Sequence, residues 1–244
     1  MSSSRRLIHN IRHGWLSVLL FYSVLLSVAF ALHYYAQKLP GAAQVALPSL
    51  VAPRAEVLEG LRRVWFIFVW GFGLQLLIQI WRIVRRRPKD ANLPQLLKHG
   101  AWISLNAGVF EELIFRYYGF AATVIGLQFA NDWAHDAIKQ TLTHTLLPVA
   151  NVLSLGLLSS QLSAANWALG GAMLLGSVFF RDAHRHYGKL AKANVWFIGL
   201  VMFWLMFNYG LVAAIIAHVL YDFVIYACLA LTSILQPALK PQAE

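Results

Sequence analysis

Long apolar stretches separated by short polar groups dominate this sequence. The stretches cover approximately residues 14–35, 64–81, 97–130, 141–160, 164–180, 193–208 and 210–235. A transmembrane helix needs roughly 20 predominantly apolar residues, and several of the stretches reach that length. The pattern predicts an all-α fold, a polytopic transmembrane helical bundle of about six to eight helices.

The predicted helices divide the chain into three parts. We expect an N-terminal two-helix membrane segment at residues 1–95, a core that carries the polar motifs at 96–235, and a short polar tail at 236–244. The basic start before residues 14–35 is also typical of a secretory signal, with a candidate cleavage site at residues 29–31. The length of the apolar stretch and the further spans after it favour an uncleaved first helix.

Charge supports a membrane location rather than nucleic-acid binding. Only 12% of the 244 residues are charged, against about 25% in an ordinary soluble domain. The net charge is +10, but the basic residues gather at predicted helix ends, in "SSSRRLIHNIRHG" and "WRIVRRRPK". This placement indicates contact with anionic lipid headgroups, so we expect membrane lipids and no nucleic acid as partners.

The same basic groups predict an orientation. Basic loops face the cytoplasm, which places the N-terminus and the cluster after the second span on that side. If every apolar stretch crosses once, "RDAHRHYGK" at residues 181–189 lies outside, against this bias. We therefore expect one of the middle stretches to be re-entrant or to lie in the membrane interface.

Three charged residues interrupt the apolar stretch at 97–130. Glu111, Glu112 and Arg116 lie in "NAGVFEELIFRYYGF", where each charge costs about 2.5 to 3.5 kcal/mol at the bilayer centre. Residues four apart share a helix face, so Glu112 and Arg116 are predicted to pair. Glu111 then remains without a local countercharge, and a carboxylate shielded from water is a good proton acceptor near neutral pH.

Two further polar pairs follow in later helices. Phe180 and His184 are four residues apart in "FRDAH", and His218 and Asp222 are four apart in "HVLYD", so each pair shares a helix face. Asp222 is expected to accept a hydrogen bond from His218 or to sit beside it in the same cavity, which fixes the orientation of the imidazole.

These three elements resemble, in order, the E-E-x-x-x-R, F-x-x-x-H and H-x-x-x-N/D motifs of the CPBP family, which comprises CAAX proteases and bacteriocin-processing enzymes. The resemblance covers roughly residues 100–230. It implies an intramembrane endopeptidase in which Glu111 and His184 activate a water molecule. His218 and Asp222 would hold the oxyanion or orient the substrate. Glu112 and Arg116 would stabilise the site.

The resemblance also implies a peptide or protein substrate, with or without a lipid group, and an integral protein of the bacterial inner (plasma) membrane with a cytoplasmic N-terminus. Zinc is an alternative to metal-free chemistry, with Glu111, His184 and His218 as its ligands. The chain has no H-E-x-x-H motif, and we favour a mechanism without a cofactor. A non-catalytic membrane protein, either a scaffold or a transporter, is the alternative function, with the same residues locking helices or lining a conduit.

Overall fold

The structure is a computed structural model that describes residues 54–84, 93–184 and 189–239, together with six single positions between residues 20 and 31. The chain divides into two compact units, residues 1–47 and 48–244. In the first unit the six described positions are helical, and the Ser27 hydroxyl donates to the Ser23 carbonyl at 2.8 Å. The rest of the predicted first span, with its signal-sequence alternative, lies outside the described residues, and so do the basic cluster after α3 and residues 240–244.

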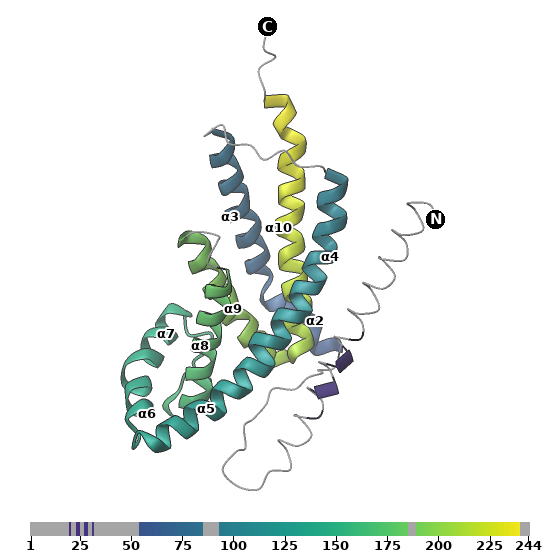
Figure 1. The fold of residues 1–244 in the computed structure, drawn as a ribbon. Helices are drawn as coiled ribbons and strands as arrows, with labels where there is room; N and C mark the ends of the chain where they lie inside the picture. The colour runs from purple at the N-terminus through teal and green to yellow at the C-terminus, as the bar shows by residue number, and fades with distance from the viewer. Residues whose placement is uncertain are drawn as a thin grey trace. The chain divides into compact units, whose positions relative to one another are not determined.

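Every regular element in the described part of the second unit is helical, which confirms the all-α prediction (Figure 1). The elements are α2 (Arg54–Arg63), α3 (Trp65–Val84), α4 (Leu93–Glu111), the π-helix η1 (Glu112–Tyr118), α5 (Gly119–Trp133), α6 (Ala137–Thr141), the π-helix η2 (Leu142–Leu146), α7 (Leu147–Leu153), the 3₁₀-helix η3 (Ala164–Asn166), α8 (Trp167–Ala183), α9 (Lys189–Tyr209) and α10 (Leu211–Leu239). The predicted tail therefore begins inside α10.

Three helices among the described residues are long and apolar enough to cross a membrane. They are Gly100–Trp133, Ala191–Tyr209 and Leu211–Leu231. A fourth span results if Glu56–Arg63 and Trp65–Trp81, which meet at an angle of 43°, are counted together. The middle stretches are shorter, since α7 has 7 residues and α8 has 17.

Helix α10 lies between α3 and α4 and also packs against α9 (Figure 1). Close approach of α4 and α10 depends on Gly108, where an added Cβ would lie 2.5 Å from Cγ2 of Val219 and 3.1 Å from its backbone nitrogen. Small residues allow membrane helices to approach in this way. The contact lies about one turn before Glu111, at the end of α4, and Glu112, at the start of η1, and one residue from His218 on α10, so it brings the two motifs together.

The predicted turn between the last two apolar stretches is present. Gly210 separates α9 from α10 with φ of +86°, a conformation that glycine adopts without a Cβ penalty. Its N–H donates to the Met206 carbonyl at 3.0 Å. The two helices therefore form an antiparallel pair in which α10 returns past α9.

A polar chain joins α3, α9 and α10. The indole N–H of Trp70 donates to Oδ1 of Asn194 at 2.7 Å, and Nδ2 of Asn194 donates to the Tyr221 hydroxyl at 2.9 Å. Gly71 leaves room for the Tyr221 ring, since a Cβ there would lie 2.5 Å from Cε2. Because Tyr221 precedes Asp222, this chain holds α10 at the level of the third motif.

Candidate active site

A π-helix carries the charged motif. The helix that begins at Leu93 changes to π-helical geometry at Glu112–Tyr118 and returns to α-helix at Gly119. The N–H of Gly119 donates to the Ile114 carbonyl, the five-residue spacing of a π-helix. Such segments are rare and occur frequently at functional sites. The sequence pattern predicted a helix here but gave no sign of its change in geometry.

The predicted ion pair within this segment is confirmed. Nη1 of Arg116 lies 3.0 Å from Oε1 of Glu112, and both side chains are completely buried. The guanidinium carbon also lies 3.8 Å from the centre of the Phe180 ring. A desolvated guanidinium over an aromatic face gains roughly 2 kcal/mol or more. Arg116 is therefore held by an anion from its own helix and by a ring from α8.

His218 on α10 reaches the same carboxylate. Its Nδ1 donates to Oε1 of Glu112 at 2.6 Å, across 106 residues of sequence. Its Nε2 lies 3.7 Å from Oε2 of Glu111 and 3.8 Å from Oδ2 of Asp222. The sequence predicted that Asp222 either bonds to His218 or lies beside it. Asp222 lies beside His218, and Glu112 is the residue that fixes the imidazole.

His184 takes the C-cap position of α8 and approaches the site from another side. Its Nδ1 lies 2.8 Å from the Phe180 carbonyl, which only accepts hydrogen bonds, so Nδ1 carries the proton and donates. Its Nε2 lies 3.8 Å from Oε1 of Glu111. The Phe180 ring contacts both imidazoles, with centroids 4.7 Å from His184 and 5.8 Å from His218.

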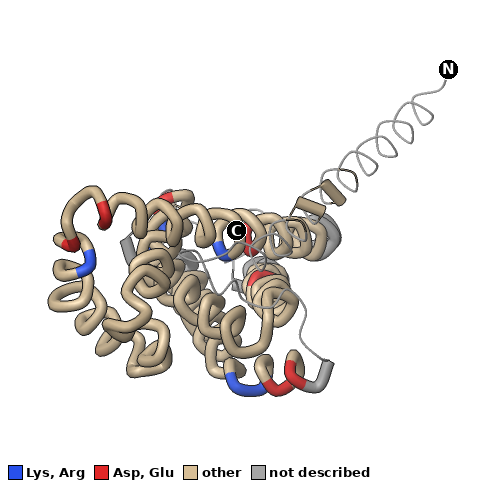
Figure 2. The backbone as a smooth tube through the Cα atoms, turned by 90° about the horizontal axis from the view of Figure 1, so that it is seen from below, with Lys and Arg blue, Asp and Glu red and all other residues tan. Residues whose placement is uncertain are grey.

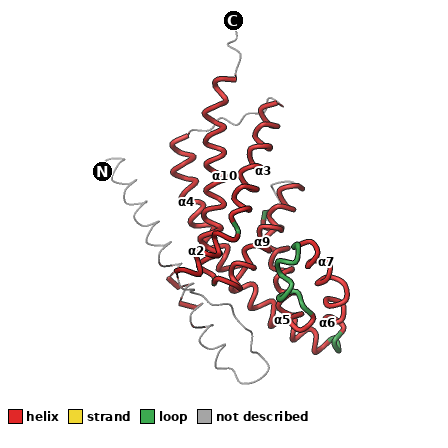
Figure 3. The backbone as a smooth tube through the Cα atoms, turned by 180° about the vertical axis from the view of Figure 1, so that it is seen from behind, coloured by secondary structure: helices red, strands yellow, loops and turns green. Residues whose placement is uncertain are grey.

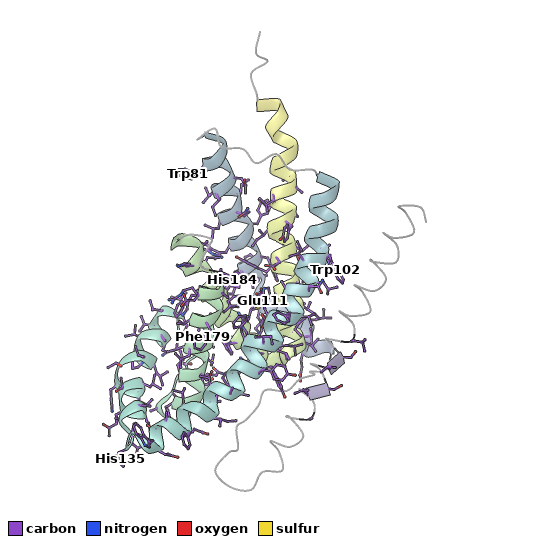
Figure 4. The ribbon with its side chains drawn as sticks, in the orientation of Figure 1. Trp81, Trp102, Glu111, His135, Phe179 and His184 are labelled. Atoms are coloured by element: carbon purple, nitrogen blue, oxygen red, sulfur yellow. The ribbon has the colours of Figure 1, made fainter. Side chains whose placement is uncertain are left out.

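The six predicted site residues therefore lie together, three of them buried and three partly exposed. Glu112 and Arg116 are fully buried, and the side chain of His218 is 6% exposed. Glu111, His184 and Asp222 are 20%, 17% and 24% exposed. Figure 4 shows Glu111 and His184 near each other in the middle of the bundle, where α4 passes α10. The side chain of Glu111 is thus partly accessible, whereas Glu112, Arg116 and His218 behind it are buried.

Two residues at the buried side escaped the sequence analysis. A Cβ added to Gly199 would lie 3.3 Å from Oγ of Ser177 and 3.4 Å from Nη2 of Arg116. The Ser177 hydroxyl is fully buried. Neither residue belongs to a motif, and an isolated serine or glycine in an apolar helix gives no signal that it lies at the buried side of a site.

Zinc would need Glu111, His184 and His218 to converge on one point. The facing nitrogens lie 3.8 Å and 3.7 Å from the Glu111 oxygens. Within the part of the chain that the structure describes, however, no group of three or more His, Cys, Asp or Glu side chains is arranged to hold a metal ion. The residues as placed do not fit zinc, and no step below passes through a metal.

The family comparison covers this site. The family model described as type II CAAX prenyl endopeptidase, Rce1-like, matches residues 94–224, more than half of the chain. The chain belongs to this Rce1-like family. The comparisons of this chain with curated proteins and with solved structures found no match. The matched region contains all six site residues, and the Rce1-like family is one of membrane-embedded CAAX-type proteases, which agrees with the candidate membrane spans of this chain.

Proposed function

We propose that this Rce1-like protein is an intramembrane endopeptidase that hydrolyses a peptide bond near the membrane surface with a glutamate-activated water. The observation that carries the proposal is the position of Glu111, whose two carboxylate oxygens face Nε2 of His184 and Nε2 of His218 at 3.8 Å and 3.7 Å. Its 20% exposure leaves it open to a water molecule and to a substrate carbonyl.

Glu111 and His184 act on the water. Because Nδ1 of His184 donates to a carbonyl, neutral His184 presents an unprotonated Nε2 toward Glu111. Nε2 of His184 and Oε1 of Glu111, which lie 3.8 Å apart, are close enough for one water molecule to donate a hydrogen bond to each. The water oxygen attacks the peptide carbonyl carbon while its proton passes to Glu111. When the C–N bond breaks, Glu111 returns that proton to the leaving amine.

His218 faces the developing oxyanion. Glu112 accepts the Nδ1 hydrogen at 2.6 Å, so the ring is oriented with Nε2 toward the reacting groups. In its doubly protonated form, His218 donates from Nε2 to the oxyanion of the tetrahedral intermediate. Asp222, 3.8 Å from that nitrogen, borders the same space and contacts the substrate. Arg116 holds Glu112 in place and does not touch the reacting atoms.

The substrate is a peptide or protein, with or without a lipid group, that reaches the site from the membrane. The family description is that of a type II CAAX prenyl endopeptidase, which supports a prenylated CAAX chain as one substrate, and the apolar helices around the site suit a lipidated chain. We also propose a location in the bacterial plasma membrane, and the basic residues at the predicted helix ends support an orientation with the N-terminus in the cytoplasm.

The test compares the termini of membrane proteins in cells that carry the wild type, Glu111→Gln or Glu56→Gln. Glu56 is an exposed glutamate on α2 and serves as the matched control. We expect at least one new terminus with the wild type and Glu56→Gln that is absent with Glu111→Gln. A peptide spanning that bond should be cleaved by the purified wild type in detergent.

The proposal fails if Glu111→Gln is folded and yields the same termini as the wild type. It also fails if neither form yields a terminus and the purified protein cleaves no peptide that spans a candidate site. The second outcome would favour a non-catalytic scaffold or transporter, in which the buried contacts among Glu112, Arg116 and His218 serve only to lock helices together.

A further inference from the structure

The segment between α5 and α8 leaves one face of the bundle and returns to it. Residues 137–153 are continuously helical through α6, η2 and α7, and residues 154–163 return in a series of turns to η3 and α8. We infer that residues 137–163 form a re-entrant hairpin that enters the bilayer from the outer face, packs on α8 and α9, and contacts lipid acyl chains without crossing.

Both arms of the hairpin pass the same level of α8. A Cβ on Gly170 would lie 2.8 Å from Leu147 on the outgoing arm and 3.4 Å from Leu162 on the returning arm. A Cβ on Gly171 would lie 2.9 Å from Leu142. The outgoing and returning arms therefore lie side by side at the start of α8, and Figure 3 shows the loop after α7 running back toward that end.

The tip of the hairpin reaches only the middle of α9. Leu157 and Leu158, in the turns after α7, line one small pocket together with Leu200 and Val201. The candidate span in α9 is Ala191–Tyr209, so residues 200 and 201 lie at its centre. A segment whose tip packs beside the centre of a neighbouring span lies inside the bilayer and does not emerge on the other side.

The non-helical backbone at the tip satisfies its own hydrogen bonds. The N–H of Gly156 donates to the Asn151 carbonyl at 2.9 Å, and the N–H of Ser154 donates to the Ala150 carbonyl at 2.8 Å. The Ser154 hydroxyl donates to the Asn151 carbonyl at 3.0 Å. An unpaired backbone group costs several kcal/mol in the hydrocarbon core, so this pairing is needed for a turn that lies at membrane depth. Leu155 and Gly156, with φ of +55° and +75°, reverse the chain at this point.

The outer surface of α7 and of the hairpin tip is apolar. Val152 is 74% exposed and Leu155 is 83% exposed, next to the turn where a water-facing loop would carry polar side chains. No Asp, Glu, Lys or Arg occurs from residue 140 to residue 180. Figure 2 shows the charged residues of the described chain in a few short groups separated by long uncharged runs. These features suit the acyl chains of a lipid bilayer as the partner.

A re-entrant hairpin also agrees with the charge bias. The helix Gly100–Trp133 leads from the basic cytoplasmic cluster to the outer face, where His135 and Asp136 form the turn. If residues 137–163 return to the outer face, α8 is the next segment to cross the bilayer, from the outer face to the cytoplasm. The basic residues of the segment 181–189 then belong to a cytoplasmic loop. The conflict that arises when every apolar stretch crosses once is then removed.

The test places single cysteines in the full-length protein and labels them with a membrane-impermeant maleimide in intact cells and in inverted vesicles. The native Cys228 is the sole cysteine and is buried, so a Cys228→Ala background removes residual signal. The positions are exposed: Ala137→Cys and Ala165→Cys at the two ends of the hairpin, Leu155→Cys at the tip and Ala183→Cys at the end of α8.

We expect Ala137→Cys and Ala165→Cys to be labelled from the outer face and Ala183→Cys from the cytoplasmic face. Leu155→Cys should be labelled only after detergent is added. Labelling of Leu155→Cys from the cytoplasmic face would mean that the segment crosses, and labelling from the outer face would mean that it lies outside the bilayer. Either result, or opposite sides for Ala137→Cys and Ala165→Cys, overturns the inference.

Discussion

Glu112 and His218 lie 106 residues apart in the sequence, and a 2.6 Å hydrogen bond joins Oε1 of Glu112 to Nδ1 of His218. The same oxygen lies 3.0 Å from Nη1 of Arg116. Hydrogen bonds to an ionised partner are shorter and stronger than neutral ones. Glu112 therefore connects η1 to α10, while the neighbouring Glu111 faces two imidazoles beyond hydrogen-bond distance.

The two adjacent glutamates should respond differently to the same substitution. Glu112→Gln leaves the buried guanidinium of Arg116 without its anion, and breaking a buried pair costs about 3 to 5 kcal/mol. Glu111→Gln breaks no direct hydrogen bond to another helix and weakens only two partly exposed contacts, 3.8 Å to His184 and 3.7 Å to His218, so we expect its stability to stay within about 1 kcal/mol of the wild type. Thermal unfolding in detergent measures both; equal destabilisation would contradict the division between a buried and an accessible carboxylate.

Arg116 should not be replaceable by lysine. Arg116→Lys keeps the positive charge but loses the planar contact with the Phe180 ring, 3.8 Å from the guanidinium carbon. We expect a loss of about 1 to 2 kcal/mol in stability and a lower rate of peptide cleavage. Arg181→Lys is the control, because Arg181 pairs with Asp182 at the protein surface and should change little. A wild-type unfolding temperature for Arg116→Lys would argue against the stacked arrangement.

The π-helix should depend on Gly119. A Cβ at this position would lie 2.8 Å from the Ile114 carbonyl oxygen, a contact that requires the π-helical turn to shift. Gly119→Ala should cost about 1 to 3 kcal/mol and should lower activity by moving Glu112 and Arg116. Gly126→Ala on α5 is the matched control, since no atom lies within 4 Å of its added Cβ. If both variants behave alike in unfolding and cleavage assays, the π-helix does not position the site.

Helix α3, which lies outside the family match, should contribute to the stability of α10. Gly71→Ala places a Cβ 2.5 Å from the Tyr221 ring and disturbs the chain from Trp70 through Asn194 to Tyr221. We expect a loss of about 1 to 3 kcal/mol. Gly73→Ala, on the same helix with no atom within 4 Å, should be neutral or slightly stabilising. Unfolding curves of the two variants measure both free energies of unfolding. If Gly71→Ala leaves the free energy of unfolding unchanged, α3 is not coupled to α10.

Metal removal distinguishes the metal-free mechanism from a zinc-dependent one. We expect the purified protein to hold less than one zinc ion per chain and to keep its cleavage activity after treatment with a chelator. Elemental analysis and a chelator titration measure this. Stoichiometric zinc, with activity lost on chelation and restored by added zinc, would assign Glu111, His184 and His218 as ligands and replace the metal-free mechanism.

Much of the site was predictable because helix geometry is local. A spacing of four residues places Glu112 beside Arg116 and His218 beside Asp222 on any helix, and the apolar stretches around them predict the bundle. By the same reasoning, Glu111 was identified as the carboxylate without a countercharge on its own helix. The turn at Gly210 followed from its sequence as well.

The sequence by itself determined the helical membrane class, the charged motif and the pairs within each helix, because these depend on composition and on contacts a few residues apart. Only the tertiary structure decided that Glu112 rather than Asp222 holds His218, that Phe180 stacks on Arg116, and that residues 137–163 turn back. Those contacts join helices whose relative rotation and depth are set by close packing at glycines such as Gly108. No periodicity along one segment records the position of a neighbouring helix, so this information arises only when the bundle assembles.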